Sequence, residues 1–254
     1  MNSIQITPLI GLAPLRRAVE EICGSAAAYH RGIVAPCHFI LALDPGNGRT
    51  TLVQHMTDRF LSCRIRHFGG LDPFLEYKLD GSMAQLKQVL SSIRDSAVYT
   101  NRFNGIVALD AAAMAAHINE PAGQLFLTEI QELAEEATLI FFFPGTMNRN
   151  MELLADKITK ALDDVQTIPL PDYTEDELAR IAEAAIEDSG VEILDQAEFH
   201  EAMQEIILSC NIRSAREATR LAAKVIRFAD YTHFQATIHS QQLQSQSLRQ
   251  TNRG

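Results

Sequence analysis

The sequence lacks several features that would point to particular classes of protein. Its 254 residues contain no tryptophan and only four cysteines, at positions without CxxC spacing, so neither a disulfide framework nor a cysteine metal site is predicted. No apolar run approaches the roughly 20 residues that a membrane-spanning helix needs. The first residues show no basic stretch followed by an apolar one, which argues against a secretion signal. We therefore expect a cytoplasmic protein without membrane insertion.

Positive charge is also scarce. The chain has 22 Lys and Arg against 32 Asp and Glu, a net charge of −10. Because affinity for nucleic acid is built largely from clustered Lys and Arg, this balance argues against a nucleic-acid partner and for a protein partner. Near the C-terminus, basic residues recur with the spacing of one helix face, which we interpret as solvated: Arg213, Arg216, Arg220, Lys224 and Arg227.

The chain does contain an apolar run that leads into a glycine-containing turn. Residues 38–43 predict a buried strand, and residues 51–60 place apolar side chains on one face of a helix. The turn between them follows the phosphate-binding pattern GxxxxGK[ST], with Gly48 at the second glycine and Thr50 at the hydroxyl position. Backbone N–H groups and a helix N-terminus in this order favour an anion. An ordinary turn without a ligand is the alternative.

Three positions depart from this pattern. Arg49 stands where lysine is expected; its guanidinium keeps the positive charge but is planar and larger than an ammonium group. Leu43 replaces the first glycine, and Asp44 adds a negative charge near a polyphosphate, unless it serves only as a turn former. We expect phosphate contacts from the loop and the helix start: Pro45, Gly46, Asn47, Gly48, Arg49, Thr50 and Thr51.

Of two further apolar runs, one ends in a polar residue and the other is followed by polar residues. Residues 105–110 end in Asp110, as does the strand that holds Mg²⁺ in phosphate-loop NTPases, where the hydroxyl of the loop completes the metal site. The metal candidates are therefore Thr50 and Asp110, acting through the nucleotide. Residues 138–143 are followed by Thr146 and Asn148, which are candidate sensors of the terminal phosphate or, alternatively, plain loop residues.

Four stretches together resemble the CbxX/CfqX branch (stage V sporulation protein K-like) of AAA+ proteins. They are residues 8–19, similar to "LIGL-x-x-V-K"; 38–51, similar to "H-M-x-F-x-G-N-P-G-T-G-K-T-T"; 169–181, similar to "F-P-D-Y-T-x-x-E-L"; and 210–216, similar to "G-N-A-R-x-x-R". The resemblance covers residues 7–230. It implies a three-layer α/β domain with a central parallel sheet, followed by a small α-helical lid, and agrees with the alternation of strand and helix signals before residue 169.

The resemblance also implies ATP or ADP with Mg²⁺ as ligands. By position, Ile10 and Gly11 would lie near the adenine, and Arg213 would sense the phosphates from the lid. Residues 75–83 correspond to a pore loop in which Tyr77 would grip a threaded chain, but a turn with a partly buried tyrosine is the favoured interpretation.

The departures from the family fall on residues that it uses for chemistry. Its catalytic glutamate is Ala111 here, its lysine is Arg49, and residues 150–179 contain no arginine to act as a finger. A general base contributes about 10²–10⁴ in rate and an arginine finger about 10³–10⁵. Another acid, for example Glu120 or Glu129, is the alternative base.

These observations predict three regions: an α/β nucleotide-binding domain over 1–169, a helical lid over 170–236 and a Gln/Ser-rich, disordered tail over 237–254. We expect a regulatory or structural subunit of a protein-remodelling assembly. It would bind ATP or ADP with impaired hydrolysis, and its partners would be itself or an active AAA+ paralogue and a protein client. The alternatives are an active ATPase that remodels complexes as a ring, and a scaffold that has lost nucleotide.

Overall fold

The computed structural model describes residues 6–30, 37–65, 74–96 and 105–229. The chain forms two compact units, Met1–Pro171 and Asp172–Gly254, and each is described by itself. The predicted tail over 237–254 lies outside the described residues.

The first unit is built on a five-stranded parallel sheet in the order β2-β3-β4-β1-β5. Because β1 lies beside β4 and not beside β2, the chain crosses over the sheet between strands, as helix-connected parallel strands do. The strands are β1 (His38–Ala42), β2 (Phe74–Lys78), β3 (Ile106–Asp110), β4 (Thr138–Phe143) and β5 (Val165–Pro169).

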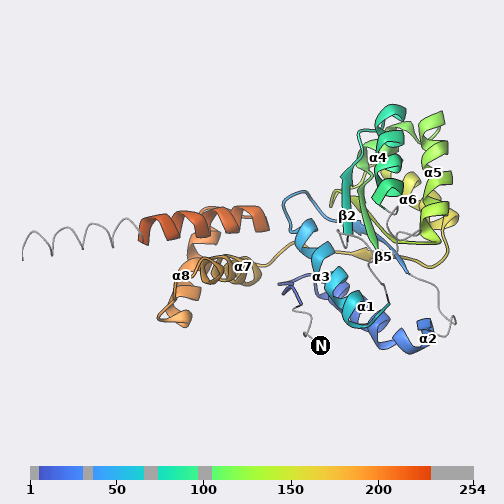
Figure 1. The fold of residues 1–254 in the computed structure, drawn as a ribbon. Helices are drawn as coiled ribbons and strands as arrows, with labels where there is room; N and C mark the ends of the chain where they lie inside the picture. The colour runs from blue at the N-terminus through green and yellow to red at the C-terminus, as the bar shows by residue number, and fades with distance from the viewer. Residues whose placement is uncertain (1–5, 31–36, 66–73, 97–104, 230–254) are drawn as a thin grey trace, which may run out of the picture. The chain divides into compact units, whose positions relative to one another are not determined.

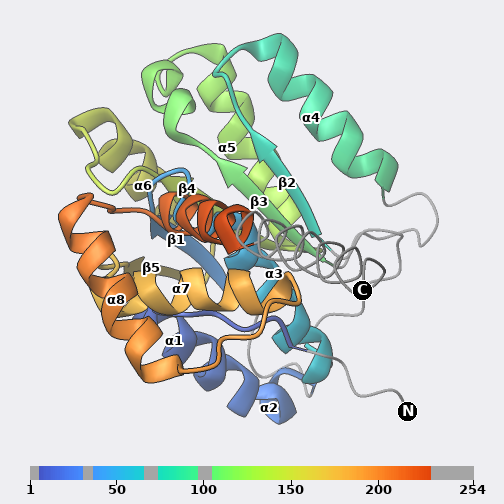
Figure 2. The same cartoon turned by 90° about the vertical axis from the view of Figure 1, so that its left-hand side faces the viewer.

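Helices cover both faces of this sheet, which gives the unit three layers (Figures 1 and 2). The predicted α/β fold with a central parallel sheet is therefore confirmed. One face carries α1 (Ala13–Gly24), α2 (Ala26–His30) and α3 (Arg49–Ser62); the other carries α4 (Met83–Ser96), α5 (Pro121–Ala134) and α6 (Arg149–Ala161). A 3₁₀ helix, η1 (Ala112–His117), follows β3.

The three central strands are buried on both faces, which explains why their sequences are continuous apolar runs. Val107, Phe141 and Phe143 belong to one large core cluster with the inner faces of α4, α5 and α6. Phe126 of α5 meets Phe141 edge to face, with ring centroids 6.2 Å apart. This packing fixes the ends of β1, β3 and β4 beside one another.

The second unit is helical. It consists of α7 (Glu175–Asp188), α8 (Gln196–Ser209) and a helix over 215–229. Its core is a smaller cluster in which Ala182 and Ile186 of α7 pack with Ile207 of α8 and Ala218. No helix in the described parts of the chain is long and apolar enough to span a membrane.

Tyr77 lies in an edge strand, so the expected turn at this position is wrong. It belongs to β2, where it is partly buried against the core of the first unit. The strand pairs in register with β3, and this pairing across the sheet outweighs the turn signal of the neighbouring Asp80 and Gly81.

Candidate functional site

The site lies at the carboxyl ends of the central strands, where the loop after β1 leads into α3. Gly46 and Gly48 adopt φ angles of 100° and 78°, a region that favours glycine, and Gly48 is the N-cap residue of α3. The first N–H groups of α3 lack carbonyl partners within the helix and create a partial positive charge at its start. The backbone of this loop therefore fits an anion such as phosphate.

Arg49, the first residue of α3, turns its guanidinium group back toward the sheet. Its Nε donates to the carbonyl of Leu43 at 2.8 Å, and its Nη2 donates to the carbonyls of Leu43 and, at 3.2 Å, Phe143. Its Nη1 forms an ion pair with Oδ2 of Asp110 at 2.8 Å. One bond from Nε, one from Nη1 and two from Nη2 use four of the five N–H donors of arginine.

Burial strengthens this arrangement. The exposed fractions of the Arg49 and Asp110 side chains are 9% and 17%, so water competes little for the ion pair. The guanidinium carbon lies 4.9 Å from the ring centroid of Phe142, within the range of a cation–π contact. A lysine ammonium is a point charge and would not reproduce the planar fork that meets three strand ends.

The residues expected to hold Mg²⁺ do not fit that ion in the arrangement described. Oδ2 of Asp110 is engaged by Arg49, and Oδ1 accepts from the backbone N–H of Ala112 at 3.3 Å. The hydroxyl of Thr50 donates to Oε2 of Glu76 in β2 at 2.8 Å. Magnesium in phosphate sites is bound by one or two carboxylates together with substrate phosphates, and both protein groups here already have partners.

The position after Asp110 is Ala111, which is completely buried and has no group able to polarise water. The two acids considered as replacements have other partners. Oε2 of Glu120 lies 2.8 Å from Nδ1 of His117 and accepts a hydrogen bond from it in the tautomer that carries a proton there, and Glu129 pairs with Arg94 of α4. Glu76 beside Thr50 was not predicted, because its relation to the loop depends on the pairing of β2 with β3.

The loop after β4 supplies the two sensor candidates. Thr146 is exposed, and Asn148 is the N-cap residue of α6, where its side chain accepts from the N–H of Met151 at 3.0 Å. This loop is tied to the phosphate-binding loop, because the N–H of Gly145 donates to Oδ1 of Asp44 at 2.9 Å. Asp44 thus holds the two loops together in addition to carrying a negative charge.

The remaining loop positions differ in exposure: Asn47 is buried, Gly46 is half-buried, and Pro45 and Thr51 are exposed. The N–H of Asn47 donates to the carbonyl of Asp44 at 3.2 Å and closes a turn inside the loop.

The adenine candidates lie in the segment before α1. Ile10 is half-buried and Gly11 is buried with a φ angle of 70°. The segment is fixed to α3 at Thr7, whose N–H donates to buried Asp58 at 2.9 Å and whose carbonyl contacts Nδ1 of buried His55 at 2.7 Å.

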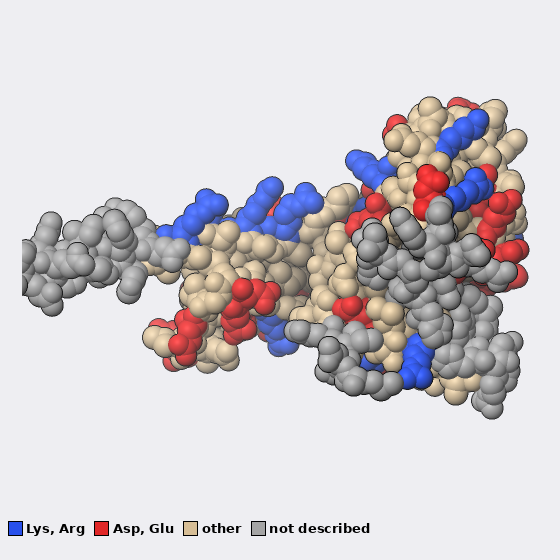
Figure 3. Space-filling model, in the orientation of Figure 1, with Lys and Arg blue, Asp and Glu red and all other residues tan. Residues whose placement is uncertain are grey.

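Arg213 belongs to the second unit. It is exposed, and its Nε donates to the side chain of Asn211 at 2.9 Å. Figure 3 shows Lys and Arg side chains in a row on this part of the unit. The basic residues that follow Arg213 in the sequence are exposed as well: Arg216, Arg220, Lys224 and Arg227. Their solvated positions agree with the spacing that predicted one helix face.

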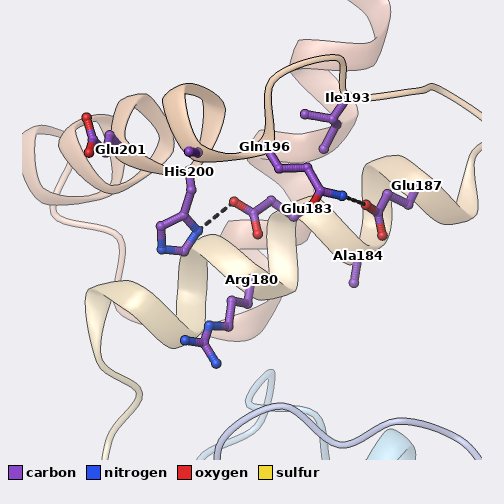
Figure 4. Close-up of a pocket in the computed structure, with 9 residues that line it drawn as sticks. Arg180, Glu183, Ala184, Glu187, Ile193, Gln196, His200 and Glu201 are labelled. Carbon is purple, nitrogen blue, oxygen red and sulfur yellow. Dashed lines mark hydrogen bonds and ion pairs between the residues drawn. The ribbon is translucent and has the colours of Figure 1, made fainter.

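The second unit also has an open pocket of about 580 Å³ between α7 and α8 (Figure 4). His200 contacts Glu183 at 2.7 Å through Nδ1 and Asp176 at 3.1 Å through Nε2. Burial lowers the pKa of His200, but the two carboxylates raise it by more, so the pKa lies above its ordinary value.

Solved structures with the same fold include ATPases of the AAA+ class. A RuvB variant from Thermotoga maritima matches with a TM-score of 0.57 and 18% identity, covering 88% of this chain and 64% of its own. A structure of katanin self-assembly has a TM-score of 0.57, 15% identity and coverages of 89% and 73%. PCH-2 from C. elegans has a TM-score of 0.55, 10% identity and coverages of 82% and 62%. The chain thus spans less than two-thirds of the RuvB and PCH-2 chains.

The fold of this chain is that of AAA+ ATPases, a class whose members bind nucleotide. No protein-family model matches the sequence. No curated protein matches it either.

Proposed function

We propose that this chain is an AAA+-fold subunit that binds ATP or ADP, hydrolyses it slowly or not at all, and serves as a regulatory or structural part of a protein-remodelling assembly. The partner in that assembly is a second copy of the chain or an active AAA+ subunit. The nucleotide part of the proposal is supported by the backbone of the loop between β1 and α3, which presents glycines with positive φ and the start of a helix to an anion.

The observation that carries the loss of hydrolysis is the pairing of Arg49 with Asp110 beside the buried Ala111. A hydrolytic site needs a cation on the phosphates, a metal held by the acid and a base for the attacking water. Here the cation and the acid satisfy each other, and the position after the acid has only a methyl group. Removing a positioned base alone lowers the rate about 10²–10⁴-fold.

The assembly part is supported by the fold and by the katanin structure, which concerns self-assembly of that protein. A subunit without its own base can still present surface to a neighbour, and nucleotide then changes assembly more than it supports turnover. The client of such an assembly would be a protein, because the net charge of −10 works against binding to phosphate backbones.

Calorimetric titration of Mg-ATP into the purified chain tests this proposal. We expect saturable binding heat followed by a flat baseline, and a change in molar mass by light scattering when nucleotide is added. Sustained heat that disappears in Asp110→Ala would contradict the loss of hydrolysis and indicate an active motor. The Asp156→Ala variant is a suitable control, because that acid forms an exposed pair with Lys160 on α6, outside the loop.

A further inference from the structure

The guanidinium of Arg49 lies where the ends of three neighbouring strands meet. Through the carbonyls of Leu43 and Phe143 and the carboxylate of Asp110, it contacts the chain at or just after β1, β4 and β3. These strands are adjacent in the sheet. A positive group is therefore built into the fold beside the acid that was predicted to hold Mg²⁺.

The groups around the loop that could bind Mg²⁺ already have partners, which disfavours a second cation beside Arg49. Arg49 balances Asp110, and Thr50 is held by Glu76. A divalent ion on Oδ2 of Asp110 would have to displace Nη1 of Arg49, leaving a buried guanidinium without its anionic partner. Removing one partner from a buried pair is strongly unfavourable.

We infer that Arg49 is the fixed cation of this site and takes the place of Mg²⁺, so that the chain binds the phosphates of a nucleotide without a divalent metal. This inference rests on the nucleotide binding proposed above. The loop backbone and the start of α3 supply the hydrogen bonds to phosphate, which need no metal.

The ligand class that suits this site best is a nucleoside diphosphate. The carboxylates of Asp44 and Glu76 remain near the loop in addition to the balanced pair. Without a metal to neutralise it, a triphosphate brings more negative charge toward these acids than a diphosphate does. ADP is therefore the appropriate probe.

The test measures the affinity of a fluorescent ADP analogue with excess Mg²⁺ and again with EDTA. We expect the two Kd values of the natural chain to agree within about threefold, well inside the tenfold change that 1.4 kcal/mol represents. In Arg49→Lys, the compact ammonium leaves Asp110 free to ligate Mg²⁺, so binding should become at least about tenfold weaker in EDTA than in Mg²⁺. Arg94→Lys, which alters an arginine paired with Glu129 between α4 and α5, should behave as the natural chain does.

A second variant and a second readout protect the test from a folding defect in Arg49→Lys. In Asp110→Asn the amide oxygen can still accept from Nη1, so Arg49 keeps a hydrogen-bond partner, but its charge is no longer balanced and ADP should bind in EDTA at least as tightly as before. With Mn²⁺ in place of Mg²⁺, the natural chain should withdraw ADP from Mn·ADP, so the paramagnetic resonance spectrum should show released aqueous Mn²⁺ and no protein-bound Mn²⁺.

The outcomes separate the two proposals. A Kd of the natural chain that weakens more than about tenfold in EDTA, or a protein-bound Mn²⁺ signal, overturns metal-free binding and leaves nucleotide binding intact. No binding of ADP under either condition contradicts the nucleotide part of the proposed function, and metal-free binding with it.

Discussion

The two units of this chain use polar side chains in different ways. At the carboxyl ends of the central strands of the first unit, Arg49 and Asp110 are mostly buried and hold these strand ends together. In the second unit, polar contacts lie at helix ends and on half-exposed faces, as in the capping box that Thr174 and Glu177 form at the start of α7. The difference indicates how much the loss of a polar side chain should lower the free energy of unfolding. The loss should be largest where the remaining partner stays buried without a hydrogen bond, and small where water can bind that partner instead.

The largest expected effect is that of Asp110→Ala. Losing the carboxylate leaves the buried guanidinium of Arg49 unpaired, and we expect the free energy of unfolding of the first unit to fall by about 3–5 kcal/mol. Amide hydrogen exchange, read separately for the two units, is the measurement: exchange should rise in β1, β3 and β4 and stay unchanged in α7 and α8.

The control for this prediction is Asp156→Ala. Its exposed pair with Lys160 should contribute less than about 1 kcal/mol. Equal losses of stability in Asp110→Ala and Asp156→Ala would mean that the buried pair of Arg49 and Asp110 contributes no more to stability than the exposed pair of Lys160 and Asp156.

An intermediate effect is expected for Thr174→Ala in the second unit. The hydroxyl of Thr174 accepts from the N–H of Glu177 at 3.2 Å, and the Glu177 side chain accepts from the N–H of Thr174 at 3.0 Å. Loss of an N-cap of this kind costs about 1 kcal/mol. Exchange should rise mainly at the start of α7, and Thr174→Ser, which keeps the hydroxyl, should retain most of the stability.

The smallest effect is expected from the titration of His200. Its folded-state pKa is raised above 6.5, so the stabilisation by Glu183 and Asp176 is complete below that pH and is lost as pH rises through the folded pKa. The stability difference between the natural chain and His200→Gln should therefore be larger at about pH 6 than at about pH 8. Urea unfolding at both values measures it; a difference that grows with pH would contradict the assignment.

Much of the fold could be predicted from the sequence because its signals are local. The apolar runs at 38–43, 105–110 and 138–143 became the three central strands, and the alternation of strand and helix gave the parallel sheet. The capping box of α7 is likewise formed by two residues only three positions apart, Thr174 and Glu177. Such features depend on neighbours in the chain and need no knowledge of the tertiary structure.

The chemistry of the candidate site could be predicted only in part, because it depends on distant residues. Arg49 was placed in the loop by its motif, but its direction is set by Phe143 and Asp110, which lie 94 and 61 residues further along the chain. The contact between Thr50 and Glu76 depends in the same way on the position of β2. Neither the periodicity of apolar residues nor the spacing within the motif predicts these contacts between distant residues.

The contacts of Arg49 have a consequence for how this sequence can change over time. Because the side chain joins three strand ends, selection for a stable fold alone is enough to retain it, whether or not nucleotide is bound. A change to lysine would lose hydrogen bonds to Leu43 and Phe143 before any benefit from a metal site appeared. The architecture around Arg49 would thus be sufficient to keep it in place even in a chain that binds no ligand at this loop.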